Sequence, residues 1–523
     1  MFLSEDIIEP FWGAPSGRLG GRDPLGIQNS SVVVYSSLIP GLTNLTRRVR
    51  YNGFYCWLLR TIARHLTEID PSSVDSKTEQ IRYIRRGELL LAYIMVGNPE
   101  LGDPNGVSGS RYAREHLDDS DDINLVLGAD AENGLDKTFW RNSMGIFGQY
   151  YLGALLQLGL VCAPGSDRNT YRCTKDGERL ADAFEANVAG QSERFWESIY
   201  NNGTLQKELL QDFICFSLTT IPDGTELDFY RKLFFDIDSV SANVTYHRAE
   251  TIRDLLTFID VNPVSRGDCS DDFLRGKFES ILENGFESAT DITKSWFLYE
   301  LNELVHSSYE AFHFGILNSL AKGTSDPVPL SKVIGALLDD VDELSMTIGV
   351  YTMNDFDVDV RAHDIYRSML KDMQSSRTSE SIFKSLQLLH FLNKHIEPIS
   401  EQIGTYAREK HLSRIGMATS LLSKFFDGRE DLSIHEFAEE MLYDAINAHM
   451  RSSYEKSTVT QGLVHNYMIE EGTIWRLRET YPIRTSPRLD SLLMYMEDIR
   501  WIGPDGEGYV IKPAGQLLMS DGR

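Results

Sequence analysis

The stretch GQYYLGALLQLGLVCAPGSDRNTYRCTKDGERLADAF (residues 148–184) carries the clearest fold signal in the chain. It begins as a short apolar helix that ends at Gly159. Two short strand-like runs follow around a polar turn, and a second helix begins near Lys175. We therefore predict a helix, a hairpin and a helix in direct succession.

This succession resembles the layout of the winged-helix superfamily, over residues 145–187. The resemblance implies that the tip of the hairpin, at Arg168 and Asn169, contacts a nucleic acid or a partner protein. The positions that carry it are Leu155, Gly159, Leu160, Tyr171, Thr174, Gly177 and Leu180.

The end of the chain has a similar layout, in LDSLLMYMEDIRWIGPDGEGYVIKPAGQLLM (residues 489–519). The pattern predicts a helix, a strand, a tight turn at Pro504-Asp505-Gly506, a second strand and a short helix. We expect a second wing-like unit here. It is similar to the first in layout but not in residues, so the sequence by itself does not predict a repeat.

The chain length of 523 residues favours two to four domains, and 42% hydrophobic residues are enough to build their cores. Amphipathic helical patterns dominate residues 191–455. We predict a mainly α, multi-domain helical protein with one or two winged-helix units. The expected domains are an N-terminal helical domain with an irregular arm (1–116), a winged helix (138–190), a helical body (191–455) and a winged-helix-like domain (456–523).

Within these domains, residues 41–66 are expected to form one helix, capped by Thr43 or Asn44. Residues 78–96 form a second predicted helix. The segment 117–136 has seven acidic residues and no basic one, which is typical of a solvated linker. Residues 337–360 are also acidic and suggest a loop. Ser433 and Glu436 have the spacing of a capping box.

Charge and cysteine usage narrow the function classes. The balance of 77 acidic and 51 basic residues gives a net charge of −26, which opposes the approach of a phosphate backbone. The five cysteines form no CxxC pair, and Cys56 is expected to be a buried free thiol. The acidic start MFLSEDIIEPFWG lacks the features of a signal peptide, and no apolar run is long enough for a membrane span. We expect a cytoplasmic protein without membrane contact.

One candidate binding element is basic and aromatic. Residues 41–66 contain five arginines and no acid. On a helix, Arg47, Arg50 and Phe54 share one face beside Arg48 and Tyr51, and such a face can hold phosphates and stack on bases. The alternative, which the charge balance favours, is that these arginines pair with the surplus carboxylates of the protein itself.

A second candidate is a polar stripe on the helix predicted for residues 296–320. Glu303, His306, Glu310 and His313 fall on one side of that helix, and their Glu-x-x-His spacing resembles that of di-metal helical bundles. In those bundles the two units lie on different helices, so a metal here needs further ligands. The candidates are His390, His395, Glu439 and His449. A stripe that makes hydrogen bonds is the favoured interpretation, and no cofactor is predicted.

Three further patterns are weak. Arg60 to His65 and Arg111 to His116 match the Arg-x4-His motif of HEPN ribonucleases, which chance also produces. Asp355, Asp357 and Asp359 alternate as in a calcium loop. However, Val360 and Tyr366 replace the required glycine and glutamate. The sequence contains no phosphate loop, nucleophile elbow, HExxH motif or dinucleotide fingerprint.

The stretch IPGLTNLTRRVRYNGFYCWLL (residues 39–59) resembles prokaryotic families encoded in genomic defence islands. The resemblance implies a role in anti-phage defence or mobile-element control, as one component of a multi-gene system. It implies no catalytic residue. The matching positions are Pro40, Gly41, Thr43, Thr46, Arg47, Arg50, Tyr51 and Trp57.

The leading hypothesis is a non-enzymatic adaptor that docks a protein from the same operon, such as an ATPase or a nuclease. A DNA-binding component and a helical enzyme, metal-dependent or HEPN-like, are the alternatives. A homo-oligomer also stays open, and no catalytic residue is predicted.

Overall fold

The computed structural model describes residues 23–520, except residues 44, 67–71, 103–105, 202, 236–246, 322–326, 415, 430, 461–463, 479 and 481–483. The acidic N-terminal start and most of the irregular arm therefore lie outside the described residues.

The fold is mainly helical, as predicted, and divides into two compact units that are each discontinuous in sequence. Unit 1 comprises Met1–Val34 and Leu274–Thr485, and unit 2 comprises Tyr35–Phe273 and Ser486–Arg523. The chain passes between them three times: within α1 (Asn29–Leu38), within α11 (Cys269–Asn284), and between Thr485 and Ser486. The units therefore alternate along the chain, whereas the sequence suggested consecutive segments.

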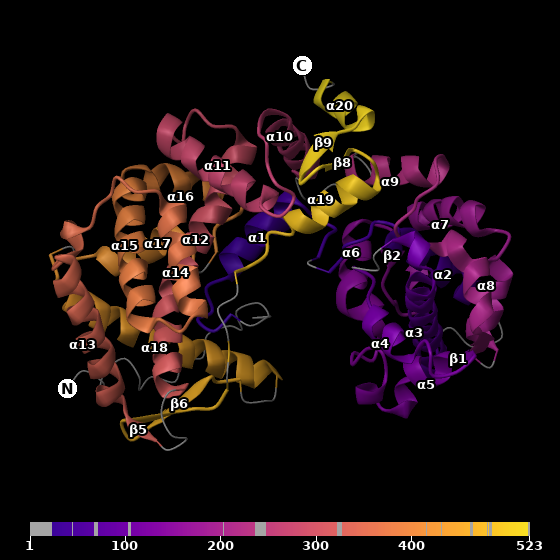
Figure 1. The fold of residues 1–523 in the computed structure, drawn as a ribbon, viewed down its shortest axis with the longest axis horizontal. Coiled ribbons are helices and arrows are strands. Elements are labelled where there is room, and N and C mark those ends of the chain that lie inside the picture. The colour runs from indigo at the N-terminus through magenta and orange to yellow at the C-terminus, as the bar shows by residue number, and fades with distance from the viewer. Residues whose placement is uncertain are drawn as a thin grey trace. The chain divides into compact units, whose positions relative to one another are not determined.

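Unit 1 is built around the 31-residue helix α12 (Asp291–Ala321), which the helices α13, α14, α15, α17 and α18 contact (Figure 1). Both its apolar and its polar residues are buried, so α12 is a core helix. Its other elements are β5 (Val328–Pro329), α13 (Leu330–Ile348), α14 (Ala362–Gln374), α15 (Thr378–Ile396), α16 (Ser400–Glu409), α17 (Ala418–Phe426), α18 (Ile434–Thr460), β6 (Tyr467–Glu470) and β7 (Thr473–Arg476), with the sheet in the order β5-β7-β6.

Two local predictions in unit 1 have different outcomes. The capping box of α18 is confirmed, because Ser433 Oγ accepts from Glu436 N–H at 3.2 Å and Glu436 accepts from Ser433 N–H at 3.0 Å. The acidic loop predicted for residues 337–360 is wrong in its first half, since α13 continues to Ile348. Val333, Leu337 and Val341 bury one face of α13 and leave its acids outside, which stabilises the helix.

Among its described residues, unit 2 contains a helical array, two short hairpins and the separate strand pair β1-β4 (Figure 1). Its elements are α2 (Tyr51–His65), α3 (Val74–Gly97), α4 (Ser110–His116), β1 (Asp122–Asn124), α5 (Leu125–Ala129), α6 (Leu152–Gln157), β2 (Val161–Cys162), β3 (Arg172–Cys173), α7 (Lys175–Val188), α8 (Ser192–Tyr200), β4 (Thr204–Gln206), α9 (Thr225–Phe235), α10 (Arg248–Val261), α19 (Leu489–Asp498), β8 (Ile502–Asp505), β9 (Gly508–Ile511) and α20 (Pro513–Ser520).

The first helix of unit 2 is shorter than predicted, because α2 begins at Tyr51 and not near residue 43. Gly41 has a positive φ of 81°, which is not a helical conformation, so the predicted helix cannot include it. The hydroxyl of Thr46 then accepts from Thr43 N–H at 2.7 Å and donates to Thr43 O at 2.9 Å, which closes a turn in place of a helix cap.

The acidic segment 117–136 is also more ordered than a linker. Strand β1 pairs antiparallel with β4, and Leu125 and Ala129 of α5 are buried. Asp130 accepts two hydrogen bonds from the buried Arg86, at 2.6 and 2.8 Å. The other acids of the segment are exposed, so the segment gives unit 2 a charged surface there.

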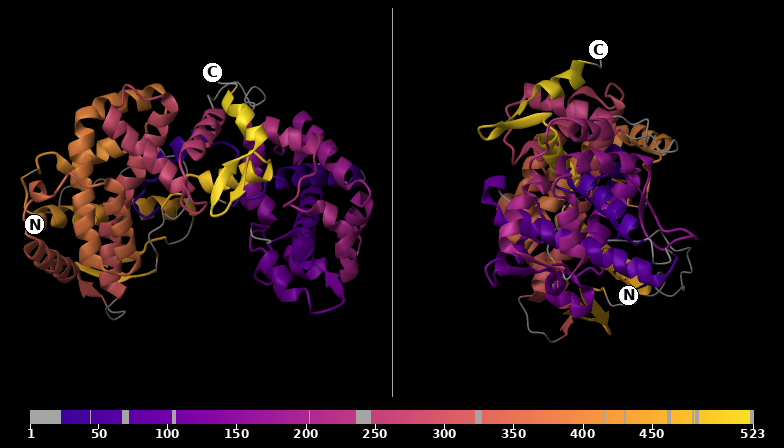
Figure 2. Two further views of the ribbon diagram at one scale, coloured as in Figure 1. Left: turned by 45° about the horizontal axis from the view of Figure 1, so that its top comes forward. Right: turned by 90° about the vertical axis from the view of Figure 1, so that its right-hand side faces the viewer.

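Two helix–hairpin–helix modules of unit 2 have the predicted order of elements. Module A is α6, β2, β3 and α7, and module B is α19, β8, β9 and α20 (Figure 2 shows module B in yellow). In module A, Leu160 N–H donates to Leu155 O and Thr174 N–H donates to Leu160 O. In module B, Trp501 N–H donates to Met496 O and Lys512 N–H donates to Trp501 O.

These bonds define a common register for the two modules, with Leu160 equivalent to Trp501 and Thr174 equivalent to Lys512. Counting three residues on from Thr174 and Lys512 reaches a glycine in each module, and counting three back reaches a tyrosine. The modules are thus a structural repeat that the sequence pattern did not disclose, because the hairpin loops differ in length.

The shared glycine has a packing role. A Cβ at Gly177 would lie 2.0 Å from Leu160 O, and one at Gly515 would lie 2.3 Å from Trp501 O. Each glycine therefore lets the second helix approach the backbone that leads into the hairpin.

We predict that Gly177→Ala lowers the free energy of unfolding of unit 2 by about 2 kcal/mol or more, because a backbone carbonyl cannot move aside cheaply. Urea denaturation measures this loss. Gly153→Ala is the matched control, since Gly153 lies in α6 with open space around it, and it should raise stability by up to about 1 kcal/mol. Equal effects of the two substitutions would contradict the packing role.

Candidate functional site

Arg50, predicted to face a nucleic acid or a partner, lies inside unit 2 and is 1% exposed. Its guanidinium donates to both carboxylate oxygens of Glu226, at 2.8 and 3.1 Å. It also donates to the carbonyls of Cys215, Ser217 and Thr220, at 2.9, 2.5 and 3.1 Å. All three nitrogens of this buried cation donate within the fold, so Arg50 is not available to a phosphate, and the expectation is corrected on this point.

Other members of the basic stretch follow the favoured alternative, in which arginines pair with carboxylates of the same protein. Arg48 donates to Asp498 at 2.8 Å, and Arg60 binds Asp182 and Glu185 of α7. Arg47, by contrast, is exposed. Arg64 is also exposed and lies 3.7 Å from Glu185. Of the arginines predicted to contact a nucleic acid or a partner in this stretch, Arg47 therefore stays the exposed candidate.

Tyr51 is 1% exposed and is also unavailable to a partner. Its ring lies against those of Tyr55 and Tyr151, with centroids 5.7 and 4.6 Å apart. Beside them, Glu88 accepts from Tyr55 Oη at 2.9 Å and from the backbone N–H of Phe147 at 2.7 Å. Burial raises the pKa of Glu88 to about 7. This cluster fills the core between α2 and α3.

The residues on which the resemblance to defence-island families rests are mostly structural. Carbonyl groups of the Pro40–Thr43 turn accept hydrogen bonds from distant side chains: Arg248 binds Pro40 O at 2.8 Å, and Ser491 binds Thr43 O at 2.9 Å. Pro40, Gly41 and Thr46 are buried. These positions therefore serve the packing of unit 2, whereas Arg47 is exposed.

At the tip of the module A hairpin, the two predicted contact residues fold back onto the protein. Arg168 donates to Cys162 Sγ at 3.2 Å and lies 3.5 Å from Asp167. Asn169 donates to Ser72 O. Both side chains are half-buried, which limits what they offer to a partner.

The polar stripe of α12 is buried in unit 1, with Glu303, His306, Glu310 and His313 each at most 4% exposed. His306 Nε2 lies 2.8 Å from Gly416 O, and its Nδ1 lies 3.4 Å from the hydroxyl of Ser31. Glu303 accepts from Thr485 N–H at 2.9 Å. These bonds agree with a stripe that makes hydrogen bonds inside the protein.

Further along the stripe, Glu310 accepts from Gln28 Nε2 at 3.1 Å, and burial raises its pKa well above the ordinary value. His313 has no hydrogen-bond partner among the described residues, and its ring lies 4.5 Å from that of His449. Nδ1 of His449 lies 3.0 Å from Pro24 O, and its Nε2 accepts from Asn466 N–H at 3.1 Å. This pair of bonds requires a neutral imidazole.

No metal site emerges from these residues. In the described part of the chain, no three His, Cys, Asp or Glu side chains come together in an arrangement that could hold a metal ion. Of His390, His395, Glu439 and His449, the described ring contacts bring His449 against the stripe, at His313. The alternating acids elsewhere form a turn, in which Asp355 accepts from the N–H groups of Tyr351 and Thr352.

The ribonuclease motifs are likewise engaged in local contacts. Arg60 is held by the carboxylates of α7, and His65 stacks on Trp196 with ring centroids 4.6 Å apart. Arg111 pairs with Glu115 one helical turn away at 2.9 Å, and His116 lies 2.9 Å from Tyr112 O. The contacts described for these arginines and histidines are therefore local to each motif, and none of them joins one motif to the other.

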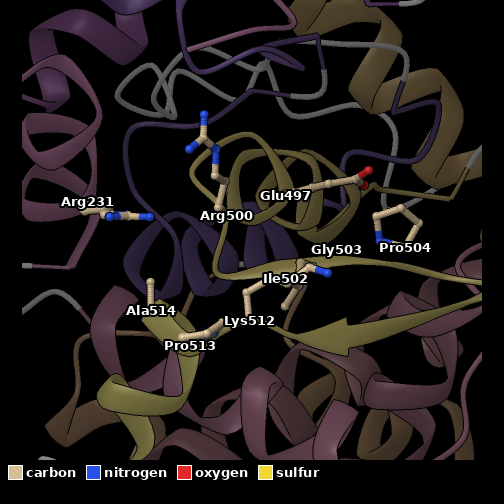
Figure 3. Close-up of a pocket in the computed structure, with 9 residues that line it drawn as sticks. All are labelled: Arg231, Glu497, Arg500, Ile502, Gly503, Pro504, Lys512, Pro513 and Ala514. Carbon is tan, nitrogen blue, oxygen red and sulfur yellow. The ribbon is translucent and has the colours of Figure 1, made fainter. Parts of the chain in front are cut away.

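A surface pocket of about 500 Å³ lies in unit 2, where module B meets α9 (Figure 3). Figure 3 shows three cationic side chains around it, together with apolar residues of β8 and α20. It is lined by Arg231, Glu497, Arg500, Ile502, Gly503, Pro504, Lys512, Pro513 and Ala514. Sequence reasoning missed this pocket. The available signal was Arg500 and Lys512, two cations that flank a hairpin in an acidic chain.

The hydrogen bonds of the pocket hold its cations at the rim. Arg231 Nε donates to Ile499 O at 3.0 Å, and Arg500 Nη2 donates to Ile221 O at 2.6 Å. Arg500 also pairs with Asp223, which is exposed. Glu497 is held by Arg266, whose Nη2 lies 2.7 and 2.9 Å from its two oxygens. The pocket therefore combines a net positive rim with an apolar wall.

Comparison of the chain with models of known families, with curated proteins and with solved structures finds no match. The resemblances to winged-helix proteins and to defence-island families therefore stay predictions. None of the described helices combines the length and the apolar character needed to cross a bilayer.

We predict that Arg50→Met lowers the free energy of unfolding by about 3–5 kcal/mol, because it leaves Glu226 buried without its counter-charge. Arg47→Met is the matched control and should change it by less than about 0.5 kcal/mol, since Arg47 is exposed. Chemical denaturation of both variants checks this. A mild effect of Arg50→Met would contradict the structural role assigned to the pair.

The buried contact between His313 and His449 in unit 1 predicts that the stability of the protein depends on pH. Burial lowers the pKa of His449 from 6.5 to about 4, so between these values the unfolded chain binds a proton that the folded chain does not. The contribution of His449 to the free energy of unfolding is therefore fully present above pH 6.5, and it is lost as the pH drops toward 4. His449→Gln, which can keep one donor and one acceptor, should reduce the loss between pH 7.5 and pH 5 by about 2 kcal/mol.

Urea denaturation at the two pH values measures this difference. The exposed His116→Gln serves as control and should leave the loss unchanged. An unaltered pH dependence in His449→Gln would show that protonation of this imidazole does not oppose folding.

Proposed function

We propose that this chain is a non-enzymatic scaffold that docks a partner protein, as one component of a prokaryotic defence or mobile-element control system. The observation that carries the proposal is the burial of Arg50 and its pairing with Glu226. The cation at the centre of the predicted phosphate-binding face is part of the core, and the side chains suggested for metal chemistry are buried as well.

The surface favours a protein partner over a nucleic acid. In a helix-turn-helix complex, the helix that enters the major groove needs to approach phosphates. The helix that precedes the hairpin in module B, α19, contains Asp490, Glu497 and Asp498, and its counterpart α6 contains no basic residue. Neither sequence complements a phosphate backbone.

A positive indication of docking lies at the end of α13 in unit 1. Met346, Ile348 and Tyr351 are 65%, 54% and 58% exposed within six residues. Asp340 and Glu343 lie exposed on the preceding turns. An apolar patch bordered by carboxylates fits a partner surface that is itself apolar with basic borders, and opposite charges accelerate such an encounter.

The experiment is co-expression of the chain with the product of each neighbouring gene, followed by size-exclusion chromatography. We expect a stable complex with one of them, weakened by Met346→Asp combined with Ile348→Asp. The matched control is Val74→Asp, at a side chain that is 75% exposed in unit 2. Absence of any complex, or turnover of a substrate by the purified chain, would contradict the scaffold proposal.

A DNA-binding role predicts that the purified chain binds duplex DNA. Binding is measured by the anisotropy of a fluorescein-labelled duplex. The scaffold proposal expects no anisotropy change at 50 mM salt. Binding that weakens steeply with salt and disappears in Arg47→Glu would favour the DNA-binding alternative.

A further inference from the structure

We propose that the pocket between module B and α9 binds an acidic peptide segment of a partner protein, with its carboxylates at Arg231, Arg500 and Lys512. The inference rests on the proposed docking function and names the chemistry of one contact. The three cations come from α9, from the turn before β8 and from the residue before α20. They thus converge on one pocket from separate segments of unit 2.

The charge balance of the pocket favours an anion. Its one acidic lining residue, Glu497, is already bound by Arg266 through both carboxylate oxygens. The positive charge of the other three side chains is therefore not cancelled from within the pocket. In a protein of net charge −26, such a local excess marks a place where a negatively charged group is accepted.

The cations are available to a ligand. Arg500 pairs with Asp223, whose side chain is 85% exposed, and Arg231 lies 3.6 Å from Asp228, whose side chain is 72% exposed. Ion pairs with such exposed carboxylates contribute little, so a ligand carboxylate can replace them. Lys512 has no ion-pair partner among the described residues, and its side chain lies over Gly503.

Module A provides an internal comparison that singles out two of the cations. By the common register, Arg500 is equivalent to Gly159, and Lys512 is equivalent to Thr174. Gly159 and Arg500 both have a left-handed backbone, with φ of 68° and 61°. A glycine adopts this conformation without strain and an arginine does not. Module B therefore has cations at positions where the same fold is built with neutral residues.

The size and walls of the pocket indicate a peptide and not a small anion. About 500 Å³ exceeds what a single phosphate needs, and Pro504, Pro513 and Ala514 offer apolar surface beside the charges. Strand β8 has β9 as its only paired strand in the described part of the chain. An extended peptide can lie along such a strand edge, with alternate side chains toward the pocket.

The test uses a fluorescein-labelled peptide of alternating glutamate and valine, titrated with the full chain and followed by anisotropy. Arg500→Gly and Lys512→Thr each install the module A residue, so both variants keep a backbone that the fold already accommodates. We expect each to weaken binding by about tenfold, as for the loss of one charge-assisted bond. Lys175→Thr, at an exposed lysine of module A, should leave binding unchanged.

Equal binding of a glutamine–valine peptide would overturn the proposal, as would full competition by inorganic phosphate at the peptide concentration. Binding that both pocket variants retain would overturn it too. The partner complex separates this failure from that of the scaffold: if the complex forms with the wild type and with both variants while the peptide does not bind, the pocket assignment fails alone. If no complex forms with the wild type, the scaffold proposal fails.

Discussion

Unit 2 is held together by buried cations, and among them Arg50 is paired with the fully buried carboxylate of Glu226. A guanidinium removed from water has to be matched by a carboxylate and by hydrogen-bond acceptors, because an unpaired buried charge is strongly destabilising. Arg50 meets this requirement through Glu226 of α9 and through three carbonyls in the segment 215–220. The start of α2 is thereby joined to two segments more than 150 residues away, and the arginine is removed from any external role.

The same constraint organises the rest of the basic stretch. Arg48 neutralises Asp498 at the end of α19, and burial raises the pKa of that carboxyl to about 6 even with the arginine beside it. Outside this stretch, the buried Arg248 holds the turn before it, since its guanidinium donates to Pro40 O. The cation-rich segment near the N-terminus thus joins distant parts of unit 2 through ion pairs and hydrogen bonds. The surplus acids remain on the surface, and the pocket of module B departs from this pattern with its positive rim.

Much of the local structure was predictable from the sequence, because it depends on neighbouring residues. The two hairpins, the long α12 and the capping box at Ser433 are of this kind. The start of α2 was predicted too early, because the turn that Thr46 closes on Thr43 was not recognised in the sequence. The sequence could also not show that Ser491, far along the chain, donates to Thr43 O. The pocket was not predictable either, since its lining joins Arg231 to residues 497–514. The equivalence of the two modules emerged from backbone hydrogen bonds and not from residue identity.

The most direct test of the central claim is a double-mutant cycle on Arg50 and Glu226, measured as free energies of unfolding. The account predicts a coupling energy of about 2 kcal/mol or more, since Arg50→Met and Glu226→Met together leave no unpaired charge in the core. Additive losses, with no recovery in the double variant, would show that the pair does not hold unit 2 together.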